Sequence, residues 1–420
     1  MDLQSTLNRL YSLHTFGIKL GLENISRFLK FIGDPQKKIK TFHIAGSNGK
    51  GSTSSFIASI LQESGFKTGL YTSPHFVKFN ERIRINGIEI PDEYIAGFVN
   101  EFDKPISDFE LTFFEVTTAM AFQYFADNKV DYAVIETGLG GRLDATNVLS
   151  PLACIITSIS LEHTAILGNT VEQIAAEKGG IIKQHSKVFL GKLPEAASKV
   201  IAKICNNTNS EIFSIDDYTN EKESSLELYT EEIELDEWTM PLKGCYQKYN
   251  AALAALAVTK TLDSDDYSAV QRGIKNVILN TGLQGRYEFF STKPDVIFDS
   301  AHNPEGVINF LNEFDSGRKK YSRTKLIFGV LEDKAVKEML SLLSKSFDEI
   351  LVTSINNERA CSTDKLLSIC NELSINAGVV TNPLGYIKSF IKEHKDNCLV
   401  VLGSMYLLGE VKTGLLNINS

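Results

Sequence analysis

The feature that most constrains this chain is a glycine-rich turn between an apolar segment and a helical one. The run TFHIA (41–45) leads into the turn, and a segment of helical period follows it. Glycines let backbone N–H groups converge on phosphate oxygens, and the start of a helix favours negative charge. In this pattern Lys50 can reach the terminal phosphates and Ser52 can face Mg²⁺. The predicted phosphate loop, for which a plain strand–helix turn is the alternative, is Gly46, Ser47, Asn48, Gly49, Lys50, Gly51 and Ser52.

Apolar runs alternate with helical segments in both halves of the chain. This alternation predicts parallel sheets covered by helices. In the first half the runs are TFHIAG (41–46), GFKTGLYTS (65–73), DYAVIETG (131–138), ACIITSIS (153–160) and KVFLG (187–191). In the second half they are DVIFDSA, TKLIFGVL, EILVTSI, AGVVTN and CLVVLGS, which favour a Rossmann-like domain.

The region between these halves has a different pattern. From about 211 to 243 the segments EIFSI, SLELYT and EEIELDEWTMPL predict antiparallel strands, which we interpret as a small sheet appended to the first domain. Two helical segments follow at 247–262 and 265–280, and NTGLQGRYEFF then marks a domain edge. We predict an ATP-binding domain over 1–282, a linker over 283–293 and a C-terminal Rossmann-like α/β domain over 294–420.

Charge and cysteine usage narrow the class of protein. The net charge of −9 argues against a general nucleic-acid binder, which needs a basic face. The six cysteines never form C-x-x-C, so they suggest neither a zinc site nor a disulfide framework. The sequence contains no apolar signal core and no run of about 18 apolar residues that could span a bilayer. We therefore expect a monomeric cytoplasmic protein that binds neither nucleic acid nor membrane.

The phosphate loop departs from the form G-x-x-x-x-G-K-[ST], because position 44 is Ile and Gly51 precedes Ser52. It resembles the G-T-x-G-K-[TG]-[TS] loop of the Mur ligase superfamily, specifically its folylpolyglutamate synthase branch. Further segments resemble that branch in the same order over almost the whole chain: TSPHF (72–76), FNERI (79–83), LTFFE (111–115), ETGLGGRLDATN (136–147), EHTAILG (162–168), EKGGIIK (177–183), GRYE (285–288) and DSAHNP (299–304).

The resemblance implies a metal site beside the loop. Glu136 ends an apolar strand, where a carboxylate can project from the carboxyl edge of a sheet. With Ser52, Ser73 and His163 it forms a predicted Mg²⁺ ligand set. In the family the Lys178 position is carbamylated by CO₂ and supplies an oxygen to a second Mg²⁺. Alternatively, His163 is a hydrogen-bonded structural residue and Lys178 a solvated helix lysine.

The resemblance also assigns residues that contact ATP. Asn250, Arg286 and Asp299 match such family positions, and domain closure could bring Arg286 onto the phosphates. His302 and Asn303 are expected to face the same cleft, with His302 as a candidate base. Lys50, Lys178 and His302 are thus the predicted catalytic residues. The sequence departs from the family pattern at Tyr246, Ser300 and Glu162, which leaves the exact nucleotide contacts open.

Three segments match those that bind the pterin-bearing substrate in bifunctional dihydrofolate/folylpolyglutamate synthases. In such a site Phe113 and Phe114 could stack on a pterin, and Glu115 or Asp144 could bind its ring N–H groups. Equally, the phenylalanines could be the core of an ordinary helix. The predicted substrate residues are Ser12, Leu13, His14, Thr112, Phe113, Phe114, Glu115, Leu143, Asp144 and Ala145.

The predicted reaction is ligation of L-glutamate to dihydropteroate or a tetrahydrofolate through an acyl phosphate, with ATP and two Mg²⁺. A monofunctional folylpolyglutamate synthase is one alternative. A peptidoglycan ligase that uses a UDP-sugar is disfavoured, because only about forty residues precede the loop. A nucleotide switch without ligation would need neither a second Rossmann-like domain nor a modified Lys178.

Overall fold

The computed structural model describes residues 2–13, 21–222, 225–228, 233–235, 240–393 and 396–416 of the 420-residue chain. The chain divides into two compact units, which we describe separately. The first consists of Met1–Pro74, Phe79–Pro241 and Lys248–Leu283. The second consists of His75–Lys78, Leu242–Gln247 and Gln284–Ser420. In the described residues no helix is both long and apolar enough to cross a membrane.

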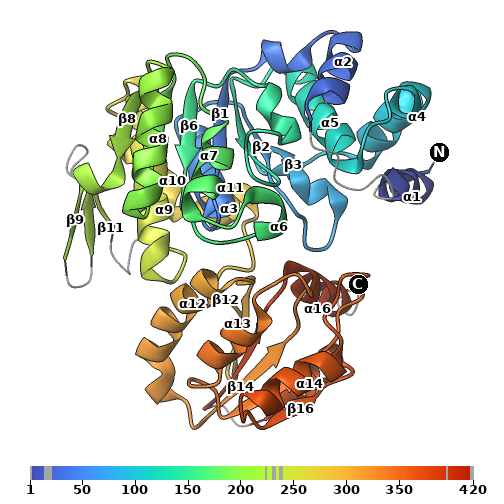
Figure 1. The fold of residues 1–420 in the computed structure, drawn as a ribbon, viewed down its shortest axis with the longest axis vertical. Coiled ribbons are helices and arrows are strands. Elements are labelled where there is room, and N and C mark those ends of the chain that lie inside the picture. The colour runs from blue at the N-terminus through green and yellow to red at the C-terminus, as the bar shows by residue number, and fades with distance from the viewer. Residues whose placement is uncertain are drawn as a thin grey trace. The chain divides into compact units, whose positions relative to one another are not determined.

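The first unit is built on an eight-stranded sheet in the order β4-β3-β2-β5-β1-β6-β7-β8 (Figure 1). The six strands from β2 to β8 are parallel, and β3 and β4 extend one edge in antiparallel fashion. The bounds are β1 (Thr41–Ala45), β2 (Thr68–Tyr71), β3 (Ile83–Ile85), β4 (Ile88–Glu89), β5 (Tyr132–Glu136), β6 (Ala153–Ile156), β7 (Lys187–Leu190) and β8 (Glu211–Ser214).

Helices cover both faces of this sheet. On one face, alternate residues of β5 pack against α5, and alternate residues of β6 and β7 pack against α7 and α8. On the other lies α3, which packs against α10 and α11. The α3 contact with α10 is close, since a Cβ at Gly273 would lie 2.5 Å from the Ile60 Cα. The helices are α1 (Leu3–Ser12), α2 (Glu23–Phe31), α3 (Lys50–Glu63), α4 (Asp92–Asp108), α5 (Phe113–Asp127), α6 (Thr164–Leu167), α7 (Val171–Gly179), α8 (Glu195–Asn207), α9 (Cys245–Leu262), α10 (Tyr267–Lys275) and α11 (Val277–Thr281).

A small antiparallel sheet is formed by β9 (Thr219–Glu221), β10 (Leu226–Leu228) and β11 (Ile233–Leu235). This confirms the predicted appended sheet, but its first predicted strand was wrong. EIFSI, at 211–215, supplies β8, which pairs in parallel with β7 at the edge of the large sheet. The preceding helix α8 acts as a crossover, and a crossover connection returns the chain to the same sheet as a parallel strand.

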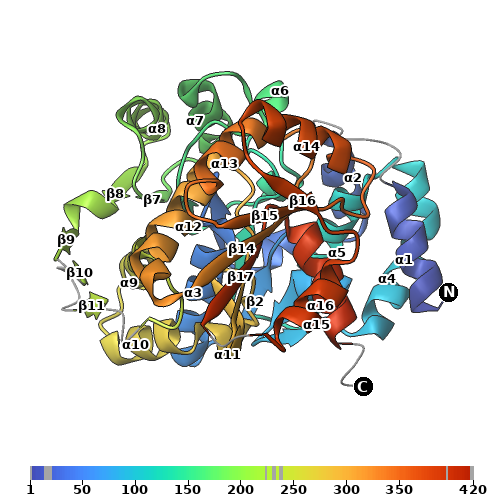
Figure 2. The ribbon, with the colours of Figure 1, turned by 90° about the horizontal axis from the view of Figure 1, so that it is seen from below.

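The second unit contains a six-stranded sheet in the order β12-β13-β17-β14-β15-β16. Every pair is parallel except β12 with β13. Two apolar clusters place α12, α13 and α14 on one face and α15 and α16 on the other, as Figure 2 shows. The bounds are β12 (Glu288–Thr292), β13 (Asp295–Asp299), α12 (Pro304–Gly317), β14 (Arg323–Phe328), α13 (Val336–Leu343), β15 (Glu349–Val352), α14 (Thr363–Glu372), β16 (Ala377–Val379), α15 (Pro383–Phe390), β17 (Asn397–Leu402) and α16 (Met405–Leu416).

The predicted fold class is confirmed: a phosphate-loop α/β domain with a small appended sheet, and a C-terminal Rossmann-like domain. Part of the segment 283–293, which was predicted as a linker, is a strand in the structure. Residues 288–292 form β12, which pairs with β13 and is held because Phe289 packs on the core of the second unit.

Candidate active site

The predicted loop and metal residues lie at one edge of the large sheet. The strands β2, β5, β1 and β6 are neighbours and parallel, so their carboxyl ends meet at the same edge. Ser73 follows β2, Glu136 is the last residue of β5, Gly46 follows β1 and Thr157 follows β6. Segments more than a hundred residues apart in sequence are thereby brought together.

The phosphate loop requires glycine at two positions. A Cβ at Gly46 would lie 1.9 Å from the Thr157 Oγ1, so no side chain fits there. Gly49 has a φ of +84° and caps α3, and a Cβ there would lie 2.6 Å from the Asn250 Oδ1. Both restrictions keep the backbone close to its surroundings and leave the start of α3 as an anion-binding terminus.

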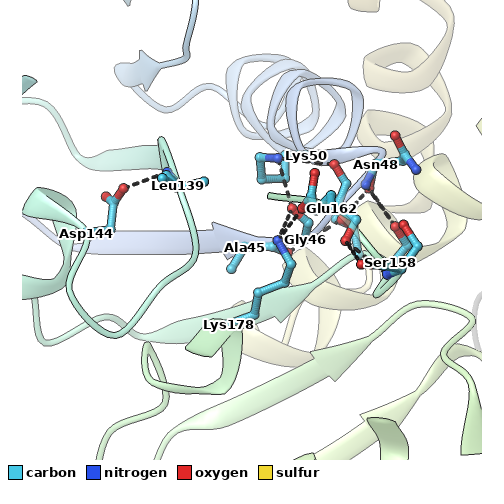
Figure 3. Close-up of polar contacts among 12 residues, drawn as sticks. Ala45, Gly46, Asn48, Lys50, Leu139, Asp144, Ser158, Glu162 and Lys178 are labelled. Atoms are coloured by element: carbon cyan, nitrogen blue, oxygen red, sulfur yellow. Dashed lines mark hydrogen bonds and ion pairs between the residues drawn. The ribbon is translucent and has the colours of Figure 1, made fainter. Parts of the chain in front are cut away.

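Two hydroxyl side chains after β6 fix the loop in this shape. The Asn48 N–H donates to the Ser158 Oγ at 2.9 Å, and the Asn48 carbonyl accepts from the Thr157 Oγ1 at 2.6 Å and the Ser158 Oγ at 3.1 Å (Figure 3). The Ser47 N–H donates to the Ser158 carbonyl at 2.9 Å. Neither Thr157 nor Ser158 was predicted to be functional. Their only signal was the pair Thr-Ser directly after an apolar strand.

Two lysines converge on the Gly46 carbonyl, and one of them also pairs with a buried glutamate. The Lys50 Nζ and the Lys178 Nζ each donate to the Gly46 oxygen at 2.8 Å, and the Lys178 Nζ also donates to the Glu162 Oε1 at 2.7 Å (Figure 3). The Lys178 side chain is 1% exposed and that of Glu162 is 8% exposed. The alternative of a solvated lysine at position 178 is therefore wrong. In the sequence, Glu162 is notable only as a departure from the family pattern.

The buried pair has strongly shifted pKa values. Burial lowers the pKa of Lys178 to about 8, although Glu162 acts in the opposite direction. Burial alone would raise the pKa of Glu162, but the ammonium groups of Lys178 and Lys50 lower it to about 2. At neutral pH the carboxylate is ionised, and the neutral amine of Lys178 is more accessible than that of an ordinary lysine.

The residues at this edge fit Mg²⁺ bound together with a nucleotide. In the described part of the chain no three His, Cys, Asp or Glu side chains gather into a metal site. Mg²⁺ does not need such a cage, because it is usually held by one or two carboxylates, water and substrate phosphates. The Glu136 Oε2 accepts from the Ser73 N–H at 3.1 Å. The hydroxyls of Thr137 and Ser160 are buried, with no hydrogen-bond partner within the described ranges, so they can serve a ligand or its water.

Other predicted nucleotide residues of the first unit lie around the loop. Ser52 is buried in the first turn of α3. Asn250, on α9, accepts a long hydrogen bond from the Thr53 Oγ1 at 3.5 Å and abuts Gly49. His163 follows Glu162, has a φ of +45° and caps the short helix α6. His163 is therefore on the same loop as the ion pair.

The predicted substrate residues at 112–115 begin helix α5. Thr112 and Glu115 form a reciprocal cap: the Thr112 N–H and Oγ1 each donate to the Glu115 Oε2 at 2.8 Å, and the Glu115 N–H donates to the Thr112 Oγ1 at 3.3 Å. Phe113 is buried between the Tyr11 ring at 5.7 Å and the Arg82 guanidinium at 5.2 Å. For Phe113 the structure therefore favours the alternative of a core residue.

The start of α5 is close to the other predicted substrate segments. Tyr11 lies next to Ser12 at the end of α1, and α1 packs on α5. Leu13 is buried in the same core, whereas His14 lies outside the described residues. Phe114 is half-buried and touches the turn after β5, because a Cβ at Gly138 would lie 2.5 Å from its ring.

Asp144 holds that turn together. Its Oδ2 accepts from the Leu139 N–H at 2.9 Å (Figure 3) and from the Gly138 N–H at 2.9 Å. Its Oδ1 accepts from the Thr146 N–H at 3.0 Å and Oγ1 at 2.5 Å. Burial raises the pKa of Asp144. Both oxygens are occupied by protein donors, which argues against a direct bond from Asp144 to a pterin ring. Its neighbours Leu143 and Ala145 lie half-buried and buried on the same turn.

A buried histidine extends this network into β1. The His43 Nε2 lies 2.8 Å from the Thr146 Oγ1. Since that hydroxyl donates to Asp144, the histidine must donate to it. Burial lowers the pKa of His43 to about 3, so the ring is neutral. No function was predicted for His43, because the pattern of TFHIA predicts only a strand.

In the second unit, two carboxylates fix the backbone beside Arg286. The Asp299 Oδ2 accepts from the Tyr287 N–H and its Oδ1 from the Ala301 N–H, each at 2.8 Å. Burial raises the pKa of Asp299. The Glu288 Oε2 accepts from the Gly285 N–H at 2.6 Å. Asp299 therefore shapes the backbone of GRYE as well as that of its own loop.

His302 and Asn303 follow β13. The His302 Nδ1 is 2.9 Å from the Ser300 carbonyl, so it carries the proton and donates, which leaves Nε2 as the basic nitrogen of the neutral ring. Asn303 is the N-cap of α12, where its Oδ1 accepts from the Gly306 N–H at 2.7 Å. The buried Asn303 side chain thus has a structural function.

Comparison with known families gives a consistent result. The family model described as the Mur ligase middle domain matches residues 44–258, and that of the Mur ligase glutamate ligase domain matches residues 285–405. The dihydrofolate synthase/folylpolyglutamate synthase of Bacillus subtilis is 37% identical over 95% of this chain and 96% of that protein. A probable bifunctional folylpolyglutamate synthase/dihydropteroate synthase of Haloferax volcanii is 33% identical over 98% of this chain, which spans 50% of that protein.

Solved structures agree over the whole chain. E. coli FolC in complex with DHPP and ADP has a TM-score of 0.88 at 28% identity, covering 100% of this chain and 99% of that one. The bifunctional folylpolyglutamate synthase/dihydrofolate synthase of Yersinia pestis, complexed with AMPPNP and Mn ion, has a TM-score of 0.85 at 28% identity, covering 99% of this chain and 98% of that one.

Proposed function

Because the chain belongs to the Mur ligase family, in its dihydrofolate synthase/folylpolyglutamate synthase branch, we propose that it ligates L-glutamate to dihydropteroate or a folate. ATP drives the reaction, and ADP and phosphate are released. The observation that carries this proposal is the Lys50 ammonium on the Gly46 carbonyl, in the loop before α3, with the buried Lys178 on the same oxygen. The charge of Lys50 and the backbone N–H groups at the start of α3 fit a triphosphate.

We assign the nucleotide to the loop Gly46–Ser52 with Asn250, and Arg286 and Asp299 to the ATP contacts that the second unit contributes. Bound Mg²⁺ neutralises charge on the phosphates. Ser52, Ser73, Glu136 and His163 would hold it. Mn²⁺ and a nucleotide accompany the related Yersinia pestis enzyme, which supports this assignment.

Lys178 has a second proposed state. As the neutral amine it can react with CO₂ to form a carbamate, and the anionic oxygens could then serve a second Mg²⁺. Burial lowers the pKa of this lysine to about 8, which favours the neutral amine that the reaction needs. The ion pair with Glu162 is then the resting state, which carbamylation would break.

The proposed chemistry has two steps. An oxygen of the substrate carboxylate attacks the γ-phosphorus of ATP, and ADP leaves. The amine of L-glutamate then attacks the acyl carbon, and phosphate leaves as the amide bond forms. The incoming ammonium must lose a proton, and the His302 Nε2 is the proposed base, oriented by the Nδ1–H bond to the Ser300 carbonyl. Positioning and charge neutralisation carry most of the catalysis.

We propose the pterin end of the acceptor near Ser12, Leu13 and His14, the start of α5 at 112–115, and the turn 143–145. Phe114, which is half-buried beside Gly138, is the better candidate for a ring contact than the buried Phe113. A monofunctional folylpolyglutamate synthase is the second candidate, because both carboxylate oxygens of Asp144 already accept hydrogen bonds from protein donors.

We further propose a monomer in the cytoplasm, with one domain over 1–282 and another over 294–420. Residues 283–293 connect them, and 288–292 of these form β12 of the second unit. Free thiols at all six cysteines, five of them buried, fit a reducing compartment.

The decisive experiment measures ADP release with ATP, Mg²⁺ and L-glutamate, with dihydropteroate or tetrahydrofolate in parallel reactions, and identifies products by mass spectrometry. We expect turnover that requires glutamate, and loss of turnover when EDTA removes Mg²⁺. Turnover with tetrahydrofolate alone would establish the monofunctional alternative. Absence of glutamate-dependent turnover with both acceptors would refute the proposal.

A further inference from the structure

A short segment between β2 and β3 belongs to the second unit, although the residues on both sides of it belong to the first. This segment is His75–Lys78, and its ring residue Phe76 packs on the apolar cluster that includes Phe298 and Leu408. Helix α16 approaches it closely, because a Cβ at Gly409 would lie 2.2 Å from the Phe76 carbonyl oxygen. Glycine is therefore needed at 409 for this contact.

Lys412 lies one helical turn after Gly409 on α16 and contacts three segments at once. Its Nζ donates to the Glu288 Oε1 and Oε2 at 2.7 and 2.6 Å and to the Gln284 Oε1 at 2.7 Å. The same ammonium lies 5.5 Å from the Phe76 ring centroid and 5.9 Å from that of Phe298. The Lys412 side chain is only 9% exposed, so its bonds to Glu288 are poorly screened by solvent.

The segment that Lys412 holds has a constrained backbone around Arg286. Gly285 has a φ of +66° and Tyr287 a φ of +47°, and the second value is unfavourable for a bulky residue. The Gly285 N–H is fixed by Glu288, and the Tyr287 N–H by Asp299. A sparsely populated conformation persists only where its surroundings enforce it. Lys412 sets the position of the Glu288 carboxylate, which in turn fixes Gly285.

We propose that Lys412 is a positioning residue for Arg286: it holds Glu288 and Gln284 so that the guanidinium is presented to ATP. This inference rests on the proposed function only in assigning Arg286 to the nucleotide. The hydrogen bonds and ring contacts that carry it lie within the second unit. Lys412 itself is not expected to touch substrate.

The test replaces Lys412 with methionine, which keeps much of the side-chain packing but removes the charge and the hydrogen bonds. We expect the affinity for a nonhydrolysable ATP analogue to fall roughly tenfold, the effect of losing about one charge-assisted contact. In the Arg286→Ala background, the same change should have almost no further effect, because two residues acting through one contact are not additive. The exposed helix lysine Lys388, changed to methionine, is the control and should leave the affinity unchanged.

The double variant separates positioning from a general structural role. If Lys412→Met lowers the affinity of the Arg286→Ala protein by the same factor as that of the wild type, the proposal is overturned. It is also overturned if Arg286→Ala leaves nucleotide affinity unchanged. Should Lys412→Met fail to fold, Glu288→Gln supplies the same cycle, since it weakens the same contact from the other side.

Binding of the ATP analogue tests the role of Lys412 independently of ligase activity. A wild-type chain that binds the ATP analogue but shows no glutamate-dependent ADP release would refute the ligase proposal. The Lys412–Arg286 cycle would still be measured by binding in that protein. Where turnover is present, kcat with ATP should fall in Lys412→Met while the KM for the folate acceptor stays unchanged.

Discussion

Glu162 and Asp144 are two buried carboxylates of the first unit that have different kinds of partner. Glu162 is paired with the Lys178 ammonium, and the lysines lower its pKa to about 2 despite burial. Asp144 is surrounded by two backbone N–H groups and by Thr146, and burial raises its pKa. A full opposite charge keeps a carboxylate ionised, and the energy of such an ion pair changes when a charged ligand binds nearby. Hydrogen bonds from neutral groups instead fix the backbone conformation around the carboxylate. The nucleotide end of the unit uses the first arrangement and the turn near α5 the second.

Removing the charged partner should have the largest effect. Lys178→Met leaves Glu162 buried without its ammonium, so the free energy of unfolding should fall by about 3–5 kcal/mol in denaturant titrations. Glutamate-dependent ADP release should fall at least ~1000-fold, because a charge at the phosphate loop is lost. The control Lys199→Met, on an exposed face of α8, should change stability by less than about 0.5 kcal/mol.

Adding Glu162→Gln to Lys178→Met tests whether the unpaired Glu162 carboxylate causes the loss of stability. The double variant should recover part of the lost stability, because the uncompensated charge is gone, but none of the activity. If the double variant were no more stable than Lys178→Met alone, the ion pair would not be the source of the loss.

Lowering the pH should change the contributions of Glu162 and Asp144 to folding stability in opposite directions. The pKa of Glu162 is lowered from 4.5 to about 2, so its contribution is present above 4.5 and is lost as the pH falls toward 2. The pKa of Asp144 is raised above 3.8, so ionisation disfavours the fold, and that cost disappears as the pH falls below 3.8. The stability difference between wild type and Glu162→Gln should shrink in acid by up to about 3 kcal/mol.

The stability difference between the wild type and Asp144→Asn should change with pH in the opposite direction to that for Glu162→Gln. The stability of the wild type relative to Asp144→Asn should increase as the pH falls toward 3.8. Chemical denaturation at a series of pH values measures both differences. Parallel slopes for the two variants would contradict the contrast between a charge-paired carboxylate and a dipole-bound one.

At neutral pH, Asp144→Asn should have a moderate effect. An amide has one acceptor oxygen, so in either orientation its NH₂ group faces N–H donors that the carboxylate now accepts. We expect a loss of about 2 kcal/mol in unfolding free energy. The KM for the folate acceptor should rise, with affinity for the ATP analogue unchanged. Asp108→Asn, on the exposed end of α4, is the control, and an equal rise in both constants would contradict a role confined to the turn.

These contrasts also mark what the sequence could and could not predict. The phosphate loop was predicted because its strand, glycines and helix are adjacent in the chain. A function for Lys178 was expected only from the family resemblance, and its burial was not predicted, since its contact with Gly46 spans 132 positions. The functions of Ser158 and His43 were missed, because an apolar alternating pattern gives strand and face but not the partners of a polar side chain. The sheet that EIFSI joins was mispredicted for a related reason: a short strand pattern does not specify its neighbour.

The smallest effect should come from the cap that joins Thr112 to Glu115. Thr112→Ala removes the hydroxyl that bonds both the Glu115 N–H and its carboxylate, while the Thr112 N–H bond can persist. Loss of such a cap costs about 1 kcal/mol, less than the loss expected at Asp144. Thr170→Ala is a matched control, because Thr170 forms the same reciprocal cap with Gln173 at the start of α7. Thermal unfolding should show similar destabilisation for both, but only Thr112→Ala should raise the KM for the folate acceptor. If both variants, or neither, raised that KM, the start of α5 would have no specific part in binding the acceptor.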